Sequence, residues 1–69
     1  MEFHLENNEY IELNRLLKLL GLVESGGQAN MFITEGQLIV NGKTEYRKRN
    51  KLRIGDVVLF MDQEVRIIK

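Results

Sequence analysis

Six of the ten lysine and arginine residues of this 69-residue chain lie between residues 43 and 53, a stretch that we call the basic segment. Its only acid is Glu45, so it carries an excess of about five positive charges, although the chain has no formal net charge. Arginine offers phosphate a planar two-donor fork, and lysine offers a mobile point charge. The segment therefore predicts binding of a polyanion, most simply a nucleic acid, through Lys43, Arg47, Lys48, Arg49, Lys51 and Arg53.

The conformation of the basic segment decides which of these side chains act together. Alternate residues of an extended strand share one face. If the segment is extended, Leu52 and Ile54 point toward the core, and four cations line the opposite side: Arg47, Arg49, Lys51 and Arg53. Tyr46 has two interpretations, a ring that stacks on an unpaired base or a half-buried aromatic of the sheet.

A second candidate anion site is the sequence Ser25-Gly26-Gly27, which we expect to begin a helix. The first N–H groups of a helix are unpaired and partly positive, and glycine lets a phosphate approach the backbone closely. Gln28 and Asn30 add neutral donors nearby. Close packing of the glycines against another helix is the alternative explanation.

Residues for covalent or metal chemistry are scarce. The chain has no cysteine, and its single histidine, His4, lies in an alternating N-terminal stretch. Asp56 and Asp62 are explained as turn residues. No nucleophile–base pair, phosphate-binding loop or metal-ligand spacing is present. We therefore expect a protein that is not an enzyme and needs no metal, cofactor or small-molecule substrate.

Charge is divided unevenly along the chain. Residues 1–36 contain six acids and two bases, whereas residues 37–69 contain eight bases and four acids. The acidic half suggests an alternative function, a protein-interaction module that meets a basic partner or a second copy through Glu2, Glu6, Glu9 and Glu12. A solvated acidic helix face is the simpler account of these glutamates.

The length is that of one domain, residues 1–69. The wholly apolar runs are only a few residues long, so no signal peptide or membrane span is expected. With the lack of cysteine, this favours a cytoplasmic protein that does not bind a membrane. We expect a monomer.

The elements that would position these side chains are two helices of about ten residues. Residues 1–5 alternate as in an edge strand, with Phe3 and Leu5 inward. Asn7 and Asn8 can cap the first helix, Gly21 can end it, and its apolar face is Leu13, Leu16, Leu17 and Leu20. Ser25, four residues after Gly21, can cap the second helix, which ends at Gly36. This helix faces the core through Ala29, Phe32 and Ile33.

The remaining residues are typical of strands joined by short turns. Asn41-Gly42 predicts a type I′ turn after an apolar strand that includes Leu38 and Val40. Gly55-Asp56 leads into a strand at 57–61, and Asp62-Gln63 reverses the chain into 64–68. The predicted fold is α+β, with two helices packed on one face of a small, strongly bent antiparallel sheet.

The order of these elements resembles the S4-like RNA-binding domain. The matching residues are Leu13, Leu16, Leu17, Gly21, Leu22, Ser25, Ala29, Phe32, Ile33, Gly36, Leu38 to Gly42, Gly55 and Asp56. Ser25 to Ala29 and the arginine-rich loop are most similar to small stand-alone bacterial members, of the YbcJ and YaaA type. The resemblance covers most of the chain and implies an αL RNA-binding motif, no catalysis, and structured RNA (ribosomal or transfer RNA, or the ribosome itself) as the partner.

The helices carry fewer cations than the family pattern has. Gly26 stands where many members of the family have arginine, and Asn30 and Met31 stand where bases are common. Only Arg15 and Lys18 remain on the first helix. We therefore expect the basic segment to supply most RNA contacts, and RNA shape to supply most of the specificity.

Overall fold

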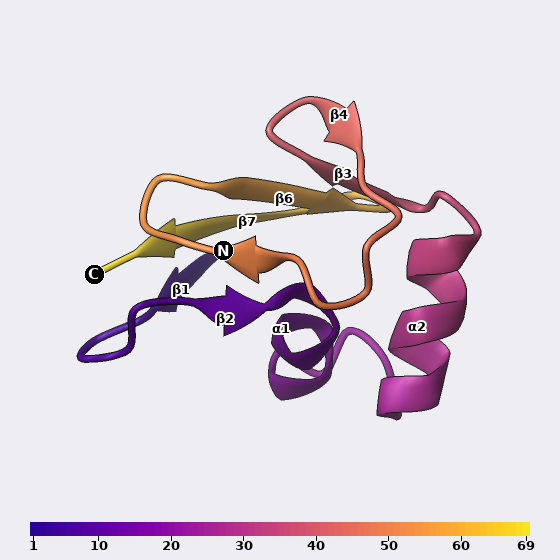
Figure 1. Ribbon diagram of the computed structural model, residues 1–69, viewed down its shortest axis with the longest axis horizontal. Coiled ribbons are helices and arrows are strands. Elements are labelled where there is room, and N and C mark those ends of the chain that lie inside the picture. The colour runs from indigo at the N-terminus through magenta and orange to yellow at the C-terminus, as the bar shows by residue number, and fades with distance from the viewer.

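The computed structural model describes residues 1–69 as two helices and seven strands. The main sheet has the strand order β1 (Glu2–His4), β7 (Gln63–Ile68), β6 (Val57–Phe60), β3 (Leu38–Val40) and β4 (Lys43–Thr44). A separate two-stranded ladder consists of β2 (Ile11–Glu12) and β5 (Lys51–Leu52). Helices α1 (Leu13–Leu19) and α2 (Gly26–Thr34) lie together at one side of the main sheet (Figure 1). The predicted α+β class is confirmed.

The main sheet is mixed, and the prediction of an antiparallel sheet was wrong. β1 runs parallel to β7, with Phe3 opposite Ile67, whereas the other pairs in this sheet are antiparallel. β1 does lie at an edge, as predicted. A parallel pair needs a long crossover connection, and here nearly the whole chain forms it. A strand of three residues carries no local signal for such a distant partner.

The two hairpins of the main sheet differ in how well their turns were predicted. Asn41 and Gly42 have φ values of 51° and 83°, as the predicted type I′ turn requires, and Val40 pairs with Lys43 across it. The second reversal occurs one residue earlier than predicted, at residues 61–62, because Phe60 pairs with Gln63. The register that keeps the alternating apolar residues of β6 and β7 on the core face fixes this position.

Helix α1 begins at Leu13, and the prediction that Asn7 or Asn8 caps it was wrong. The side chain of Asn8 instead donates to the carbonyl oxygen of Leu5 at 3.1 Å. The next residues are extended because Ile11 pairs with Leu52 in the small ladder. α1 consequently has only seven residues and no side-chain cap.

Helix α2 begins as predicted. Ser25 is its N-cap, and the Ser25 hydroxyl accepts a hydrogen bond from the N–H of Gln28 at 3.1 Å. Gly21, which follows α1 after one intervening residue, has the left-handed φ expected of it, 72°. The stretch between the helices, residues 20–25, is longer than predicted because α1 ends earlier.

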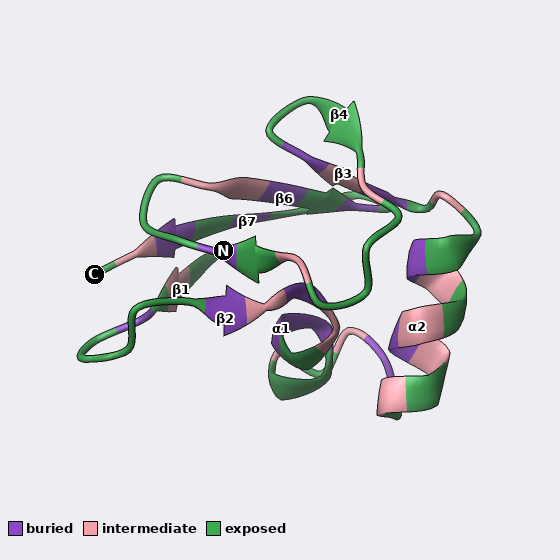
Figure 2. Cartoon of the chain, viewed as in Figure 1, coloured by how far each residue is buried: buried purple, intermediate pink, exposed green.

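One hydrophobic core holds the helices against the sheet. It comprises 15 buried residues, including Leu13, Leu16 and Leu17 of α1 and Ala29 and Ile33 of α2. The ring of Phe32 packs on that of Phe60 in β6, with centroids 5.2 Å apart. Buried stretches alternate with exposed ones along both helices and the main sheet (Figure 2). Neither helix is long and apolar enough to cross a membrane.

The basic segment is not extended throughout, contrary to prediction. Residues 47–50 form a turn in which the N–H of Asn50 donates to the carbonyl oxygen of Arg47 at 3.2 Å. Leu52 is fully buried as predicted, but Ile54 is 61% exposed. The turn interrupts the alternation, so Arg47, Arg49, Lys51 and Arg53 do not share one strand face.

Leu52→Ala should destabilise the protein, because Leu52 is the buried side chain that joins the basic segment to the core. We expect a loss of about 2–5 kcal/mol in the free energy of unfolding, measured by chemical denaturation with circular dichroism. Ile54→Ala, two residues away and exposed, is the matched control and should change it by less than about 0.5 kcal/mol. Equal losses in the two variants would contradict this placement of β5.

Candidate nucleic-acid interface

Backbone hydrogen bonds hold the basic segment against the start of α1. The N–H of Leu13 donates to the carbonyl oxygen of Asn50 at 2.9 Å, and the N–H of Asn14 donates to that of Lys48 at 3.0 Å. Both N–H groups belong to the first turn of a helix without a side-chain cap and would otherwise lack a partner within the helix. The turn at 47–50 is therefore fixed through its backbone, and the side chains of Lys48 and Arg49 remain exposed.

Most predicted cations of the interface have no acidic partner. The chain contains two ion pairs, Arg47 with Glu45 and Arg66 with Glu64, and only the first involves a predicted RNA contact. The predicted contacts that are exposed and make no ion pair are Arg15, Lys18, Lys43, Lys48, Arg49, Lys51 and Arg53. These side chains can meet phosphate without first breaking an internal ion pair.

Arg47 differs from the other cations because Glu45 holds it. Its Nε and Nη2 atoms donate to the two carboxylate oxygens at 2.9 and 3.1 Å, and its backbone N–H donates to Oε2 at 2.9 Å. The side-chain hydrogen bonds from Arg47 keep the pKa of Glu45 below its ordinary value, although partial burial opposes this, and they raise the pKa of Arg47. Arg47 is thus partly neutralised within the protein.

The two helical cations are three residues apart and are therefore neighbours on the surface of α1. Lys18 is one turn after Asn14, so these two residues share a face. On that face the side chain of Asn14 donates to Asn30 of α2 at 3.1 Å, which ties the helices together. Arg15 shares its face with Leu19, and both line a groove beside Tyr10. The N–H of Asn14 also donates to Lys48, so the residue that ties the helices together lies beside the turn at 47–50, whereas Arg15 lines the groove.

A second, smaller groove brings cations of the basic segment together. Lys43 of β4, Arg47 and Lys51 of β5 line an open space of about 470 Å³, together with Glu45 and Asp56. Asp56 has a structural function here, since its carboxylate accepts hydrogen bonds from the Asn41 side chain and the backbone N–H of Arg53. Arg47 lines this groove and begins the turn at 47–50, so Lys43 of β4 lies on the same surface as the turn.

Two cations lie against Tyr10, which the sequence did not single out. The Lys51 Nζ atom is 4.9 Å from the ring centroid, and the guanidinium carbon of Arg53 is 5.6 Å from it. Both distances are within the range of cation–π attraction. The available signal was the alternation from Tyr10 to Leu13, which places Tyr10 and Glu12 opposite the buried Ile11 and Leu13.

Tyr46 is 61% exposed and is not the half-buried sheet aromatic of one interpretation. Its ring lies beside Gly36, where a Cβ atom would approach it to 3.2 Å. Gly36 also has a left-handed φ of 80°, so any other residue there would be strained as well as crowded. Tyr46 is therefore accessible to an unpaired base, as the stacking interpretation requires.

The start of α2 stands apart from the basic segment. A Cβ atom at Gly26 would meet nothing within 4 Å, and one at Gly27 would meet only the Ser25 hydroxyl at 3.9 Å. Close packing therefore does not explain the two glycines. The Gln28 side chain already accepts a hydrogen bond from the N–H of Glu24 at 2.7 Å. This end of α2 is opposite the end near Gly36, where Tyr46 packs (Figure 1).

The two packed helices beside a small mixed sheet define the class of the protein, a small α+β domain with an αL motif. Its family follows from comparison with known proteins. Residues 3–68 match the family model of the S4 domain, and the chain belongs to this family. The predicted resemblance is confirmed.

One relative and one solved structure match almost the whole chain, and a second relative matches three quarters of it. Over 66 residues it is 44% identical to the Escherichia coli (strain K12) protein named "Putative RNA-binding protein YbcJ", covering 96% of this chain and 94% of that one. Over 52 residues it is 40% identical to the Bacillus subtilis (strain 168) "Probable ribosome maturation protein RlbA", covering 75% and 73%. The solution structure of YbcJ from E. coli, described as revealing an αL motif involved in RNA-binding, matches with a TM-score of 0.75 and 43% identity, over 99% of this chain and 86% of that one.

Glu45→Gln should lower the melting temperature at neutral pH, because it removes the charge that pairs with Arg47. The pKa of Glu45 is lower in the folded protein than its ordinary value of 4.5, so the stability due to its charge is complete above that value. It is lost as the pH falls through the folded pKa. Thermal melts by circular dichroism from about pH 7 to about pH 3 should show the gap between parent and variant closing below that value. If the difference in melting temperature between parent and variant stays constant down to acid pH, the charge of Glu45 is not what stabilises the folded protein.

Proposed function

We propose that this protein binds structured RNA without catalysing a reaction, and that ribosomal or transfer RNA is its partner. The name and structural description of YbcJ support RNA as the ligand. The name of the Bacillus subtilis relative supports a cytoplasmic role in association with the ribosome.

The observation that carries this proposal is the set of unpaired cations fixed beside α1. Lys48 and Arg49 make no ion pair, and the backbone of their turn is already ordered by hydrogen bonds to α1. A surface that is ordered before binding loses less entropy when the ligand arrives. Each phosphate that it neutralises releases counterions from the RNA, which adds affinity that depends on salt.

The shape of the protein favours recognition through sugars and phosphates. Of its three phenylalanines and two tyrosines, only Tyr10 and Tyr46 are exposed. Proteins that read many unpaired bases use a larger platform of exposed aromatic rings. We therefore infer that phosphate contacts supply most of the affinity, and that few unpaired bases are bound.

The double variant Lys48→Ala/Arg49→Ala should weaken binding to labelled transfer RNA by at least about tenfold at low salt, measured by fluorescence anisotropy. For the parent, about four neutralised phosphates would give a slope of log K against log salt near −3 to −4, and the variant should reduce its magnitude by about 1.8. The melting temperature should change little, because both side chains are exposed.

The matched control is Arg66→Ala/Lys69→Ala, which removes the same charge from elsewhere on the protein. Val65 and Ile67 of β7 point into the core, so Arg66 between them points from the opposite face of the sheet. This control should retain the affinity and slope of the parent. If both double variants lose affinity equally, binding reflects overall charge and the turn at 47–50 is not the site.

Gly27→Ala tests whether the start of α2 belongs to the interface. Alanine fits at this position, so the variant should gain up to about 1 kcal/mol in the free energy of unfolding. If RNA phosphate approaches the backbone here, the same variant should bind transfer RNA several-fold more weakly in the anisotropy titration. A stabilised variant with the affinity of the parent would remove Ser25, Gly26, Gly27 and Gln28 from the interface.

A further inference from the structure

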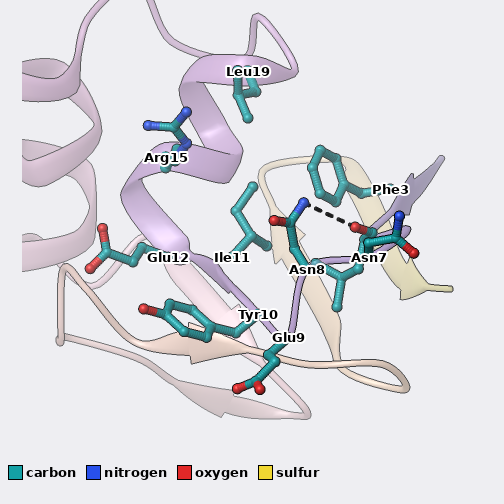
Figure 3. Close-up of a pocket in the computed structure, with 10 residues that line it drawn as sticks. Phe3, Asn7, Asn8, Glu9, Tyr10, Ile11, Glu12, Arg15 and Leu19 are labelled. Carbon is teal, nitrogen blue, oxygen red and sulfur yellow. Dashed lines mark hydrogen bonds between the residues drawn. The ribbon is translucent and has the colours of Figure 1, made fainter.

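A groove of about 580 Å³ opens between α1 and the chain that leads from β1 to β2. Half of its ten lining residues are hydrophobic. Arg15 and Leu19 enter it from α1, and Tyr10 and Glu9 lie on the opposite side (Figure 3). It shares no lining residue with the groove that Lys43, Arg47 and Lys51 line.

Tyr10 connects this groove to the basic segment. Tyr10 lines the groove, whereas Lys51 and Arg53 lie over its ring at cation–π distance but do not line the groove. The guanidinium of Arg53 also donates to the carbonyl oxygen of Glu9 at 3.5 Å. Tyr10 is 38% exposed as a residue and therefore partly accessible to a ligand. Tyr10 thus has two cations over its ring and belongs to the lining of an open, partly apolar groove.

The charges of the groove suit a nucleobase better than a phosphate. Glu9 and Glu12 line it and would repel phosphate, but carboxylates accept hydrogen bonds from the amino groups of bases. The ring of Tyr10 offers a surface for stacking, and the guanidinium of Arg15 can stack on a base as well. Phosphates on either side of that base would find Lys51 and Arg53 next to Tyr10.

We propose that this groove accepts one unpaired nucleobase of the bound RNA, stacked on Tyr10, while Lys51 and Arg53 hold the adjoining phosphates. The inference rests on the proposed RNA-binding function and extends it to the kind of RNA, a helix with a bulged or looped-out nucleotide. A peptide suits the site less well. Lys51 and Arg53 repel a basic peptide, and Glu9 and Glu12 repel an acidic one.

The test uses two RNA hairpins of otherwise identical sequence. One carries the fluorescent base 2-aminopurine as a single-nucleotide bulge, and the other carries it paired in a continuous stem. The full chain is added at low salt, anisotropy gives the affinity, and 2-aminopurine fluorescence reports stacking. We expect the protein to quench only the bulged base and to bind that hairpin about tenfold more tightly. Tyr10→Leu should abolish both effects, and Tyr10→Phe, which keeps the ring, should retain them.

The outcomes separate this inference from the proposed function. If the protein binds both hairpins with equal affinity and does not quench the 2-aminopurine fluorescence, the inference about the groove is wrong and the proposed function stands. If Tyr10→Leu weakens both hairpins equally, Tyr10 only positions Lys51 and Arg53, and the groove is again overturned. If the parent binds neither hairpin, the proposed function fails and the groove fails with it. An arginine-rich peptide that shifts the methyl NMR signals of Ile11 and Leu19, where the bulged hairpin does not, would assign the groove to a protein partner.

Discussion

Two backbone hydrogen bonds at the start of α1 determine where the candidate interface lies. α1 has no side-chain cap, and the carbonyl oxygens of Asn50 and Lys48 satisfy its N–H groups at Leu13 and Asn14. Unpaired N–H groups at a buried helix end are costly, so the turn is held there by the needs of the helix. The same contact brings the turn beside the Asn14–Asn30 bridge between the helices. A fold requirement thus places the cations and the helical pair on one surface.

Elements with strong local signals were predictable from the sequence. Asn41-Gly42 and Ser25 have steric and hydrogen-bonding preferences that hold in most contexts, and both are where the sequence placed them. The predicted start of α1 was wrong, because the pairing of Ile11 with Leu52 keeps the chain extended past Asn7 and Asn8. The parallel pairing of β1 with β7 joins the two ends of the chain, and a window of a few residues contains no information about it.

For the candidate site, residue types were easier to predict than arrangement. The charge of the basic segment is evident from composition, but its division into a turn and a short strand depends on contacts with α1 and β2. The pairing of Arg47 with Glu45 also depends on the local bend of the chain. Tyr10 was missed because its importance comes from Lys51 and Arg53, which are distant in sequence and meet it only after folding.

An interface for phosphate has to keep like charges close together without neutralising them. Side-chain ion pairs would stabilise such a cluster but would compete with the ligand, as Glu45 does for Arg47. Here the backbone of the turn is held by hydrogen bonds to α1, and the buried Leu52 holds the adjoining strand. Neither of these two contacts uses a charged side chain, and the carboxylates of Glu45 and Asp56 hold the segment by accepting hydrogen bonds from the backbone N–H groups of Arg47 and Arg53. Lys48, Arg49 and Lys51 are thus kept in place without ion pairs of their own. The cations consequently remain free for an anionic partner while their positions stay fixed.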